Sequence, residues 1–252
     1  MITVLDVYTK LAEFAPIEAK MDFDNVGHLV GASAGAVTRI LLSLDITSDV
    51  IAEAADVGAE LIVSHHPLFF SLKEVTDATV TGRKVIALIR NNIAAVCMHT
   101  NLDAARGGVN DRLAAAAGLI NAEVMPDFPY GRFGFIEKPA PLAEYLSKIK
   151  DSLHSNGLRY YDAGRPVRRV AVVGGSGGSE LPRAVGLGCD TLLTADVKYD
   201  VFLDAKELGV NLIDGDHFCT ENVVLAALEE ALRFPGVRVA RSARHGQTAR
   251  FF

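Results

Sequence analysis

The 252-residue sequence is half hydrophobic, 22% charged and carries a formal net charge of −6. This composition is typical of a globular protein with one large or two small domains, and it lacks the general positive field that attracts nucleic acid or anionic lipid. No run approaches the roughly 18 apolar residues of a membrane span, so neither nucleic acid nor a membrane is an expected partner. Three cysteines without paired spacing favour reduced thiols and a cytoplasmic location.

The first half of the chain alternates between predicted strands and helices. Residues 4–14 carry apolar side chains at helical spacing, broken by Asp6 and Glu13, which predicts an amphipathic helix and not a signal peptide. The next predicted strands cover residues 39–44, 61–63 and 93–98, and the predicted helices cover residues 47–56, 81–91 and 111–117. Strands joined by helices through right-handed crossovers form a parallel sheet.

A break after residue 125 separates this pattern from a second one. Pro126, Pro129, Gly131 and Gly134 punctuate the chain there, which marks a passage into a second lobe. The second set of predicted elements consists of an extended segment at 132–136, helices at 143–153 and 181–185, a helix ending at 208, and strands at 170–173, 191–193 and 210–213.

Spacings from the first pattern recur in the second. Thirteen positions separate Asp45 from Gly58 and Gly175 from Gly188, and seven positions separate Gly58 from His65 and Gly188 from Ala195. The second lobe therefore resembles a degenerate copy of the first. The sequence predicts an α/β fold of two duplicated lobes with mainly parallel central sheets. The first lobe is expected at 1–127, completed by 233–252, and the second at 128–232.

Two adjacent histidines, His65 and His66, follow the strand at 61–63, and Pro67 prevents that strand from continuing. Open α/β folds build their sites at the carboxyl ends of parallel strands, and imidazoles there are natural ligands for zinc or iron. The alternative is a pair of loop histidines without a role.

His217 and Glu221 supply further ligand types near the start of a helix expected at 220–232. Four residues apart, they can lie close together, although Glu221 is also explained as a carboxylate favoured by the helix dipole. Together with His65, His66 and Asp103, they give three imidazoles and two carboxylates at strand ends. That set is sufficient for two divalent ions with one bridging carboxylate, the arrangement of a hydrolytic two-metal site.

Two further side chains and one loop have open interpretations. His99, at the same strand end as Asp103, is a candidate general base, a partner of a metal ligand, or a structural histidine. Asp45 either orients an imidazole or caps a helix. The run 174–178 follows a strand, but Glu180 stands where a dinucleotide fingerprint needs glycine and no P-loop lysine follows, so it is a tight turn or an anion-binding nest.

The sequence resembles the GTP cyclohydrolase I type 2 homologue family, also called the NGG1-interacting-factor-3-like family, in the compact form without an inserted domain. The resemblance runs nearly end to end. Its motifs are Asp24-Asn25-Val26-Gly27, Ser64-His65-His66-Pro67, His99-Thr100-Asn101-Leu102-Asp103, Thr194-Ala195-Asp196-Val197-Lys198-Tyr199, and Asp216-His217 with Thr220-Glu221. The departures are Asp200, where the family often has histidine, Ala195 in place of a smaller residue, and Gly215-Asp216 before His217.

This resemblance implies two interlocked α/β lobes and a toroidal homohexamer. It implies a dinuclear site with the ligands His65, His66, Asp103, His217 and Glu221, of which Asp103 and Glu221 are the candidates for bridging. The two divalent ions per subunit can be zinc, iron or manganese. The expected function is metal-dependent hydrolysis of a small nucleotide-like or heterocyclic substrate, GTP cyclohydrolase-like by resemblance. The alternative is a non-catalytic, ring-shaped metal-binding scaffold or metal-handling protein.

Overall fold

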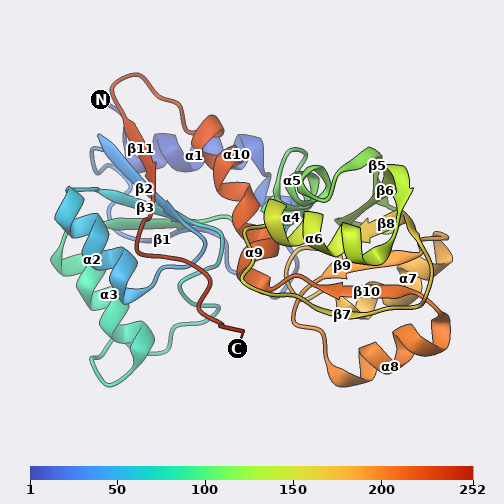
Figure 1. The fold of residues 1–252 in the computed structure, drawn as a ribbon. Helices are drawn as coiled ribbons and strands as arrows, with labels where there is room; N and C mark the ends of the chain where they lie inside the picture. The colour runs from blue at the N-terminus through green and yellow to red at the C-terminus, as the bar shows by residue number, and fades with distance from the viewer. Residues whose placement is uncertain (252) are drawn as a thin grey trace. The chain divides into compact units, whose positions relative to one another are not determined.

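The computed structural model describes residues 1–251, and contacts divide the chain into two compact units (Figure 1). Unit 1 comprises residues 1–106 and 225–246, and unit 2 comprises residues 107–224 with the segment that follows residue 246. Each unit is thus completed by a segment from the carboxyl-terminal part of the chain. The lobe boundaries expected at residues 127 and 232 stay a prediction.

Unit 1 contains a five-stranded sheet in the order β1-β4-β3-β2-β11. Strands β2, β3, β4 and β11 run parallel, and β1 pairs antiparallel with β4. The strands are β1 (Gly27–Val30), β2 (Arg39–Ser43), β3 (Leu61–Ser64), β4 (Ala94–Cys97) and β11 (Arg238–Arg241). Every residue of β3 and β4 is buried, which explains why these strands are continuous apolar runs in the sequence.

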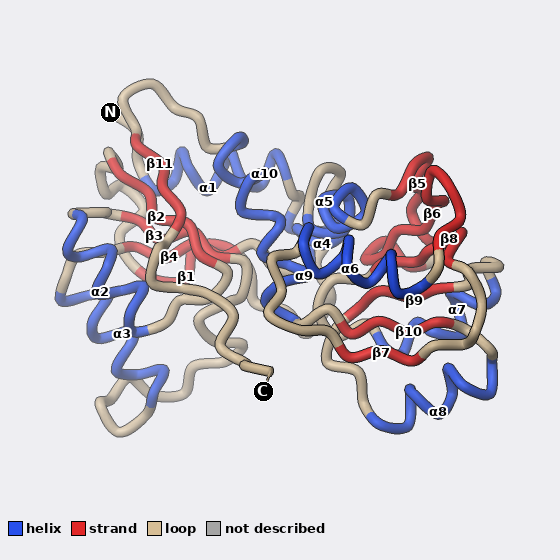
Figure 2. The backbone as a smooth tube through the Cα atoms, viewed as in Figure 1, coloured by secondary structure: helices blue, strands red, loops and turns tan. Residues whose placement is uncertain are grey.

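Helices cover both faces of this sheet (Figure 2). The helices of unit 1 are α1 (Val4–Phe14), α2 (Ser48–Val57), α3 (Val80–Arg90), α4 (Thr100–Ala104) and α10 (Leu225–Ala231), with a 3-10 turn at Ile17–Ala19. Val50 of α2 and Leu88 of α3 pack in one cluster with Leu41 and Ile62 of the sheet. On the other face, α10 contacts both β2 and α1. This arrangement makes unit 1 a three-layer α/β/α structure.

Unit 2 contains a six-stranded sheet in the order β5-β6-β8-β9-β10-β7. Its central strands β8, β9 and β10 run parallel, whereas β5, β6 and β7 pair antiparallel with their neighbours. The strands are β5 (Leu119–Met125), β6 (Phe128–Ala140), β7 (Arg159–Tyr161), β8 (Val167–Val172), β9 (Thr191–Thr194) and β10 (Asn211–Asp214).

The helices of unit 2 also form two layers. They are α5 (Val109–Ala116), α6 (Leu142–Ser152), α7 (Leu181–Gly186), α8 (Tyr199–Leu208) and α9 (His217–Glu221), with 3-10 turns at Gly178–Glu180 and Asn222–Val224. Val170 and Val172 of β8 belong to the core cluster that contains α5 and α6 residues, and Ala171 belongs to the cluster of α7 and α8. Successive residues of a strand point to opposite faces, so β8 contributes to both cores.

The two units share one four-strand topology. In unit 1 the strands β1, β2, β3 and β4 lie in the order 1-4-3-2, and in unit 2 the strands β7, β8, β9 and β10 lie in the order 7-10-9-8. In both cases the first strand is antiparallel to the last, and the other three are parallel. The expected α/β class is confirmed, and this match extends the internal repeat from spacing to topology. Within residues 1–251, no helix is both long and apolar enough to cross a bilayer.

Candidate metal centre

The double histidine follows β3 directly and is still held by the sheet. The backbone amide of His65 donates to Ser43 O at 3.3 Å and that of His66 donates to Leu44 O at 2.9 Å. These bonds continue the parallel β2–β3 ladder beyond the last strand residue. His65 is fully buried and His66 is partly buried. The sheet therefore fixes the backbone of both histidines at the carboxyl edge of unit 1.

Three imidazoles of unit 1 have the same tautomer, because each Nδ1 atom faces an oxygen that can only accept. His65 Nδ1 lies 2.9 Å from Met98 O. His66 Nδ1 lies 2.7 Å from Asp45 Oδ1, and His99 Nδ1 lies 2.8 Å from Asp24 Oδ1. The hydrogen-bonding hydrogen is thus on Nδ1 in each ring, and in the neutral form of each ring the lone pair is on Nε2. Such contacts fix the orientation of imidazoles that bind metals.

The three histidines converge. One ligand nitrogen from each of His65, His66 and His99 lies within 4.8 Å of the other two. Asp103, in helix α4, places Oδ1 3.6 Å from His65 Nε2. Unit 1 therefore brings together four residues singled out from the sequence, and three imidazoles with one carboxylate are a suitable donor set for a borderline divalent ion.

Asp45 connects the histidine cluster to the end of the chain. Its Oδ1 accepts from His66, and its Oδ2 lies 2.9 Å from His245 Nε2. Burial raises the pKa of Asp45, but the hydrogen bonds from His245 and His66 outweigh burial and hold the pKa well below its usual range. Thr47, not Asp45, caps helix α2 by accepting from the Val50 amide. Of the two roles considered for Asp45, the geometry therefore favours orientation of an imidazole.

Asp24 orients His99 as Asp45 orients His66, because its Oδ1 atom accepts from Nδ1 of the ring. Its other oxygen, Oδ2, accepts from the Thr100 amide at 2.9 Å and from Thr100 Oγ1 at 2.5 Å. Burial raises the pKa of Asp24, but hydrogen bonds from His99 and Thr100 outweigh burial and hold the pKa well below its usual range. Asp24 is thus a buried, ionised carboxylate that fixes the His99 ring.

Unit 2 carries the second group of ligand candidates. Helix α9 begins at His217, three residues earlier than predicted, so His217 and Glu221 occupy its first and last positions. His217 Nδ1 lies 2.6 Å from Asp196 Oδ2, and Nε2 lies 3.1 Å from Glu221 Oε2. Burial lowers the pKa of His217, but the carboxylates of Glu221 and Asp196 outweigh burial and raise the pKa to about 9. Two carboxylates therefore hold a positive charge at this position.

The glycine-rich run 174–178, which follows β8, packs against His217 and Glu221. A Cβ atom at Gly175, where φ is +62°, would lie 2.2 Å from Glu221 Oε1 and 3.1 Å from His217 Nε2. The Gly175 amide donates to Thr220 Oγ1 at 3.1 Å, and the Gly177 amide donates to Thr194 Oγ1 at 2.9 Å. These two amides are directed at protein acceptors, which favours the tight turn, and the turn leaves room for the Glu221 carboxylate.

Sequence reasoning gave no role to Asp24, Asp196 or His245. Both aspartates lie within motifs of the resembled family, but Asp24 follows a polar loop without a helical or strand pattern, whereas Asp196 follows strand β9. His245 lies 200 residues from Asp45, so no local pattern connects the two. A search for carboxylates at strand ends of the repeat would have found Asp196, because it follows β9 as His66 follows β3.

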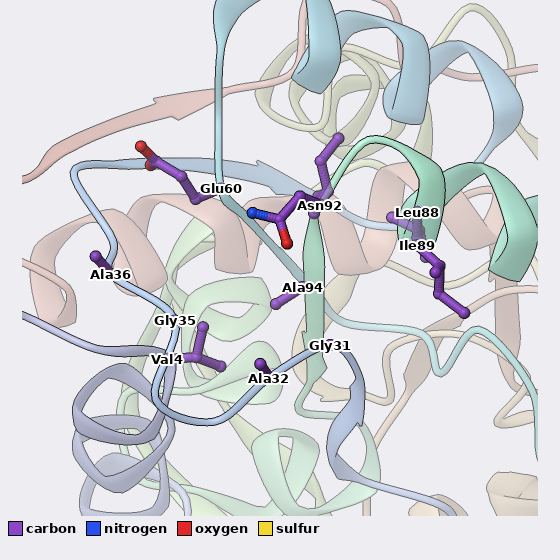
Figure 3. Close-up of a pocket in the computed structure, with 11 residues that line it drawn as sticks. Val4, Gly31, Ala32, Gly35, Ala36, Glu60, Leu88, Ile89, Asn92 and Ala94 are labelled. Carbon is purple, nitrogen blue, oxygen red and sulfur yellow. The ribbon is translucent and has the colours of Figure 1, made fainter.

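A cavity of about 250 Å³ in unit 1 lies away from this chemistry (Figure 3). Gly31, Glu60 and Ala94 line it, at the beginnings of β3 and β4, whereas the histidines follow the ends of these strands. Glu60, the charged member of its described lining, accepts from the amides of Thr38 and Arg39. The cavity is therefore separate from the candidate metal centre.

Comparisons with known proteins agree with this picture. The sequence model of the family described as Duf34/NIF3 (NGG1p interacting factor 3) matches residues 2–245. A GTP cyclohydrolase 1 type 2 homolog from Clostridium perfringens is 38% identical over 236 residues, covering 90% of each chain. One from Clostridium acetobutylicum is 34% identical over 249 residues, covering 94% of this chain and 93% of the relative. The crystal structure of a Bacillus cereus protein related to NIF3 has the same fold, with a TM-score of 0.93 at 23% identity, covering 100% of this chain and 99% of its own.

Proposed function

Because the chain belongs to the Duf34/NIF3 (NGG1p interacting factor 3) family, we propose that it is a metal-dependent hydrolase of a small nucleotide-like or heterocyclic substrate. The name shared by its relatives, GTP cyclohydrolase 1 type 2 homolog, makes a purine nucleotide the first substrate to test. The observation that carries the proposal is the convergence of three imidazoles, each oriented through Nδ1 so that Nε2 is the donor atom.

The proposed centre is dinuclear. Its ligands are His65, His66 and Asp103 from unit 1 and His217 and Glu221 from unit 2, and it holds zinc, iron or manganese. A bound divalent ion supplies Lewis acidity and makes water a better nucleophile near neutral pH. The chemistry of the donors supports this assignment: the unit 1 imidazoles bond through Nδ1 and leave Nε2 as the donor atom, and in unit 2 the carboxylates of Asp196 and Glu221 lie on either side of His217.

His99 is proposed as the proton-transfer group. The buried carboxylate of Asp24 holds its ring in one orientation and stabilises the imidazolium that forms when Nε2 takes up a proton. One ring nitrogen of His99 also lies within 4.8 Å of a ring nitrogen of His65 and of His66, so His99 can instead serve as a third nitrogen ligand. The metal content of His99→Gln distinguishes these roles, because a base can be lost without loss of metal.

The test compares the His65→Asn variant with the wild-type protein. An asparagine amide can still donate to Met98 O, as Nδ1 does, but it has no counterpart of Nε2. We expect the purified protein to contain metal and to hydrolyse at least one member of a panel of nucleotides and phosphoesters, and we expect His65→Asn to lose both properties. His154→Asn is the matched control, since His154 is exposed in unit 2 with φ of 52°, which asparagine tolerates.

Retention of metal by an inactive wild-type protein would instead favour the alternative, a metal-binding scaffold or metal-handling protein.

We also propose a homohexameric ring in the cytoplasm. The three cysteines are free thiols buried in the protein, as expected for a reducing compartment. Light scattering that gives six times the chain mass supports the hexamer, and a monomer mass contradicts it.

A further inference from the structure

Two phenylalanine side chains of unit 1 are exposed beside the histidine cluster. Phe23 keeps 64% of its surface exposed, and Phe70 keeps 55%. Single exposed apolar residues are common on proteins, but these two rings contact each other, with centroids 6.0 Å apart. Phe70 also contacts the His99 ring, at a centroid distance of 5.8 Å. The pair is therefore an extension of the candidate metal centre and not a scattered surface feature.

The backbone that carries these rings is fixed. Phe23 precedes Asp24, a buried residue whose carboxylate bonds to the His99 ring. Phe70 follows Phe69, and Asn25 Nδ2 donates to Phe69 O at 2.8 Å, which ties the two loops together. Anchored neighbours thus hold both rings outward. Such rings are pre-organised, and a ligand that stacks on them orders little further structure.

Together the side chains form a row of aromatic rings. The row runs from Phe23 to Phe70, from Phe70 to His99, and from His99 to His65, the last two with centroids 5.1 Å apart. The interplanar angles of the first two pairs are 50° and 60°, so neither phenylalanine is stacked face to face within the protein. The solvent-exposed end of the row consists of the two phenylalanines, and the other end consists of histidines of the proposed metal centre.

We propose that Phe23 and Phe70 are the stacking platform for a planar heterocyclic ring of the substrate and set the preference for aromatic over aliphatic ligands. This inference rests on the proposed function, because it concerns the substrate of the same centre. Exposed aromatic faces gain most from another π-system in an offset or edge-to-face arrangement. A ring bound there has its neighbouring atoms directed along the row toward His99 and the ligand histidines.

The loop that carries Phe70 supports a binding role. It connects β3 to α3 through residues 65–79 without a helix or strand, which is long for such a connection, and long loops are commonly functional. Leu72 and Val75 on this loop are also exposed, 37% and 45% respectively. The loop therefore presents apolar surface to solvent next to a polar, ligand-rich centre, as a site for a small amphiphilic molecule does.

A fluorescence experiment tests the platform directly. The chain contains no tryptophan, so Phe70→Trp introduces a single reporter that keeps an aromatic face at this position. We expect its emission to be quenched, saturably, by at least one member of a panel of guanosine, adenosine, nicotinamide riboside and neopterin. Tripolyphosphate, which has no ring, should leave the emission unchanged. Absence of saturable quenching by every ring compound would overturn the proposal.

Affinity measurements on alanine variants give the second arm. Calorimetry on full-length, metal-loaded protein should show that Phe23→Ala and Phe70→Ala each weaken binding of the ring compound by about 5- to 150-fold, the range for loss of one stacking contact. Ile89→Ala removes a similarly exposed apolar side chain, 60% exposed, from the cavity of Figure 3 and should leave the affinity unchanged.

Metal content and particle mass separate the possible failures. If both phenylalanine variants keep metal and bind the ring as tightly as the wild type does, the platform is refuted while the metal centre stands. If the wild type contains no metal, the proposed function fails, and ring binding to Phe70→Trp is then judged by quenching alone. If light scattering shows that Phe23→Ala or Phe70→Ala changes the oligomeric state without changing ring affinity, the rings belong to a contact between copies and the proposal is wrong.

Discussion

At the residue scale, two neighbouring carboxylates determine the charge of His217. Asp196 and Glu221 flank its two ring nitrogens. In the metal-free protein a proton is bound to the His217 ring. A metal ion binds only the neutral imidazole, so it must displace this proton. Proton and metal therefore compete for His217.

The competition predicts a pH dependence of metal binding. With the pKa of His217 raised to about 9, metal uptake at pH 7 must release a proton, and metal affinity should rise about tenfold per pH unit until pH 9. In the metal-free protein, the raised pKa stabilises the fold fully below about pH 6.5, and this stabilisation is lost as the pH rises through 9. The measurement is proton release into weakly buffered solution on addition of zinc.

Asp196→Asn should reduce this proton release at pH 7.5, because it removes one of the two carboxylates that raise the pKa of His217. Asp204→Asn, an exposed position on α8, should leave it unchanged. Equal proton release from all three proteins would contradict the assigned cause of the pKa shift.

The proposed ligand residues were predictable individually, whereas their supporting contacts were predictable only in part. His65, His66 and Asp103 attract attention in a sequence because ligand types follow a buried strand at short range. Asp45, which lies 21 residues from His66 at the end of the preceding strand, was a candidate for orienting an imidazole, but Asp24 lies 75 residues from His99 and His245 lies 200 residues from Asp45. No periodicity or spacing relates such positions, since only the folded sheet brings them together.

At the scale of elements, the turn after β8 controls the geometry of α9. Gly175→Ala would place a methyl group on the Glu221 carboxylate and add the cost of a left-handed backbone for a residue with Cβ, about 1–2 kcal/mol. We expect metal affinity to fall at least tenfold although no ligand is replaced. Isothermal titration with zinc checks this.

Gly186→Ala is the matched control for that variant. Nothing lies within 4 Å of a Cβ at Gly186, the last residue of α7, and alanine is favoured over glycine in a helical conformation by at most about 1 kcal/mol. Its metal affinity should equal that of the wild type and its stability should be equal or higher. Similar losses in both variants would show that the Glu221 contact is not the cause.

The central strands of the two sheets were predictable from the sequence, whereas the edge strands β5 and β11 were not. The strands β2, β3, β9 and β10 lie in apolar runs, because both faces of each are covered by helices. Strand β5 is an edge strand in which the residues from Ile120 to Val124 are exposed, and β11 is an edge strand exposed at three of its four residues. An exposed edge strand pairs through its backbone on one side only, so it needs no apolar run and leaves little pattern in the sequence.

At the scale of the whole molecule, the proposed ligands belong to both units, so metal should couple the unfolding of the two. A metal at 100 times its dissociation constant stabilises the folded state by about 2.7 kcal/mol. We expect removal of metal with a chelator to lower the urea midpoint and to split one unfolding transition into two. Tyrosine fluorescence and circular dichroism report this. An unchanged midpoint after verified metal removal would contradict shared ligation.

The late position of β11 in the chain has a consequence for synthesis. A nascent chain that ends at residue 224 already contains every strand of the unit 2 sheet, from β5 to β10, but lacks β11, whose Arg238 pairs with Arg39 of β2. At ribosomal rates of 5–20 residues per second, the β2 edge stays unpaired for about 10 to 40 s after it emerges. During that interval the exposed β2 edge is available for wrong pairing with other chains, and synthesis of β11 closes this edge.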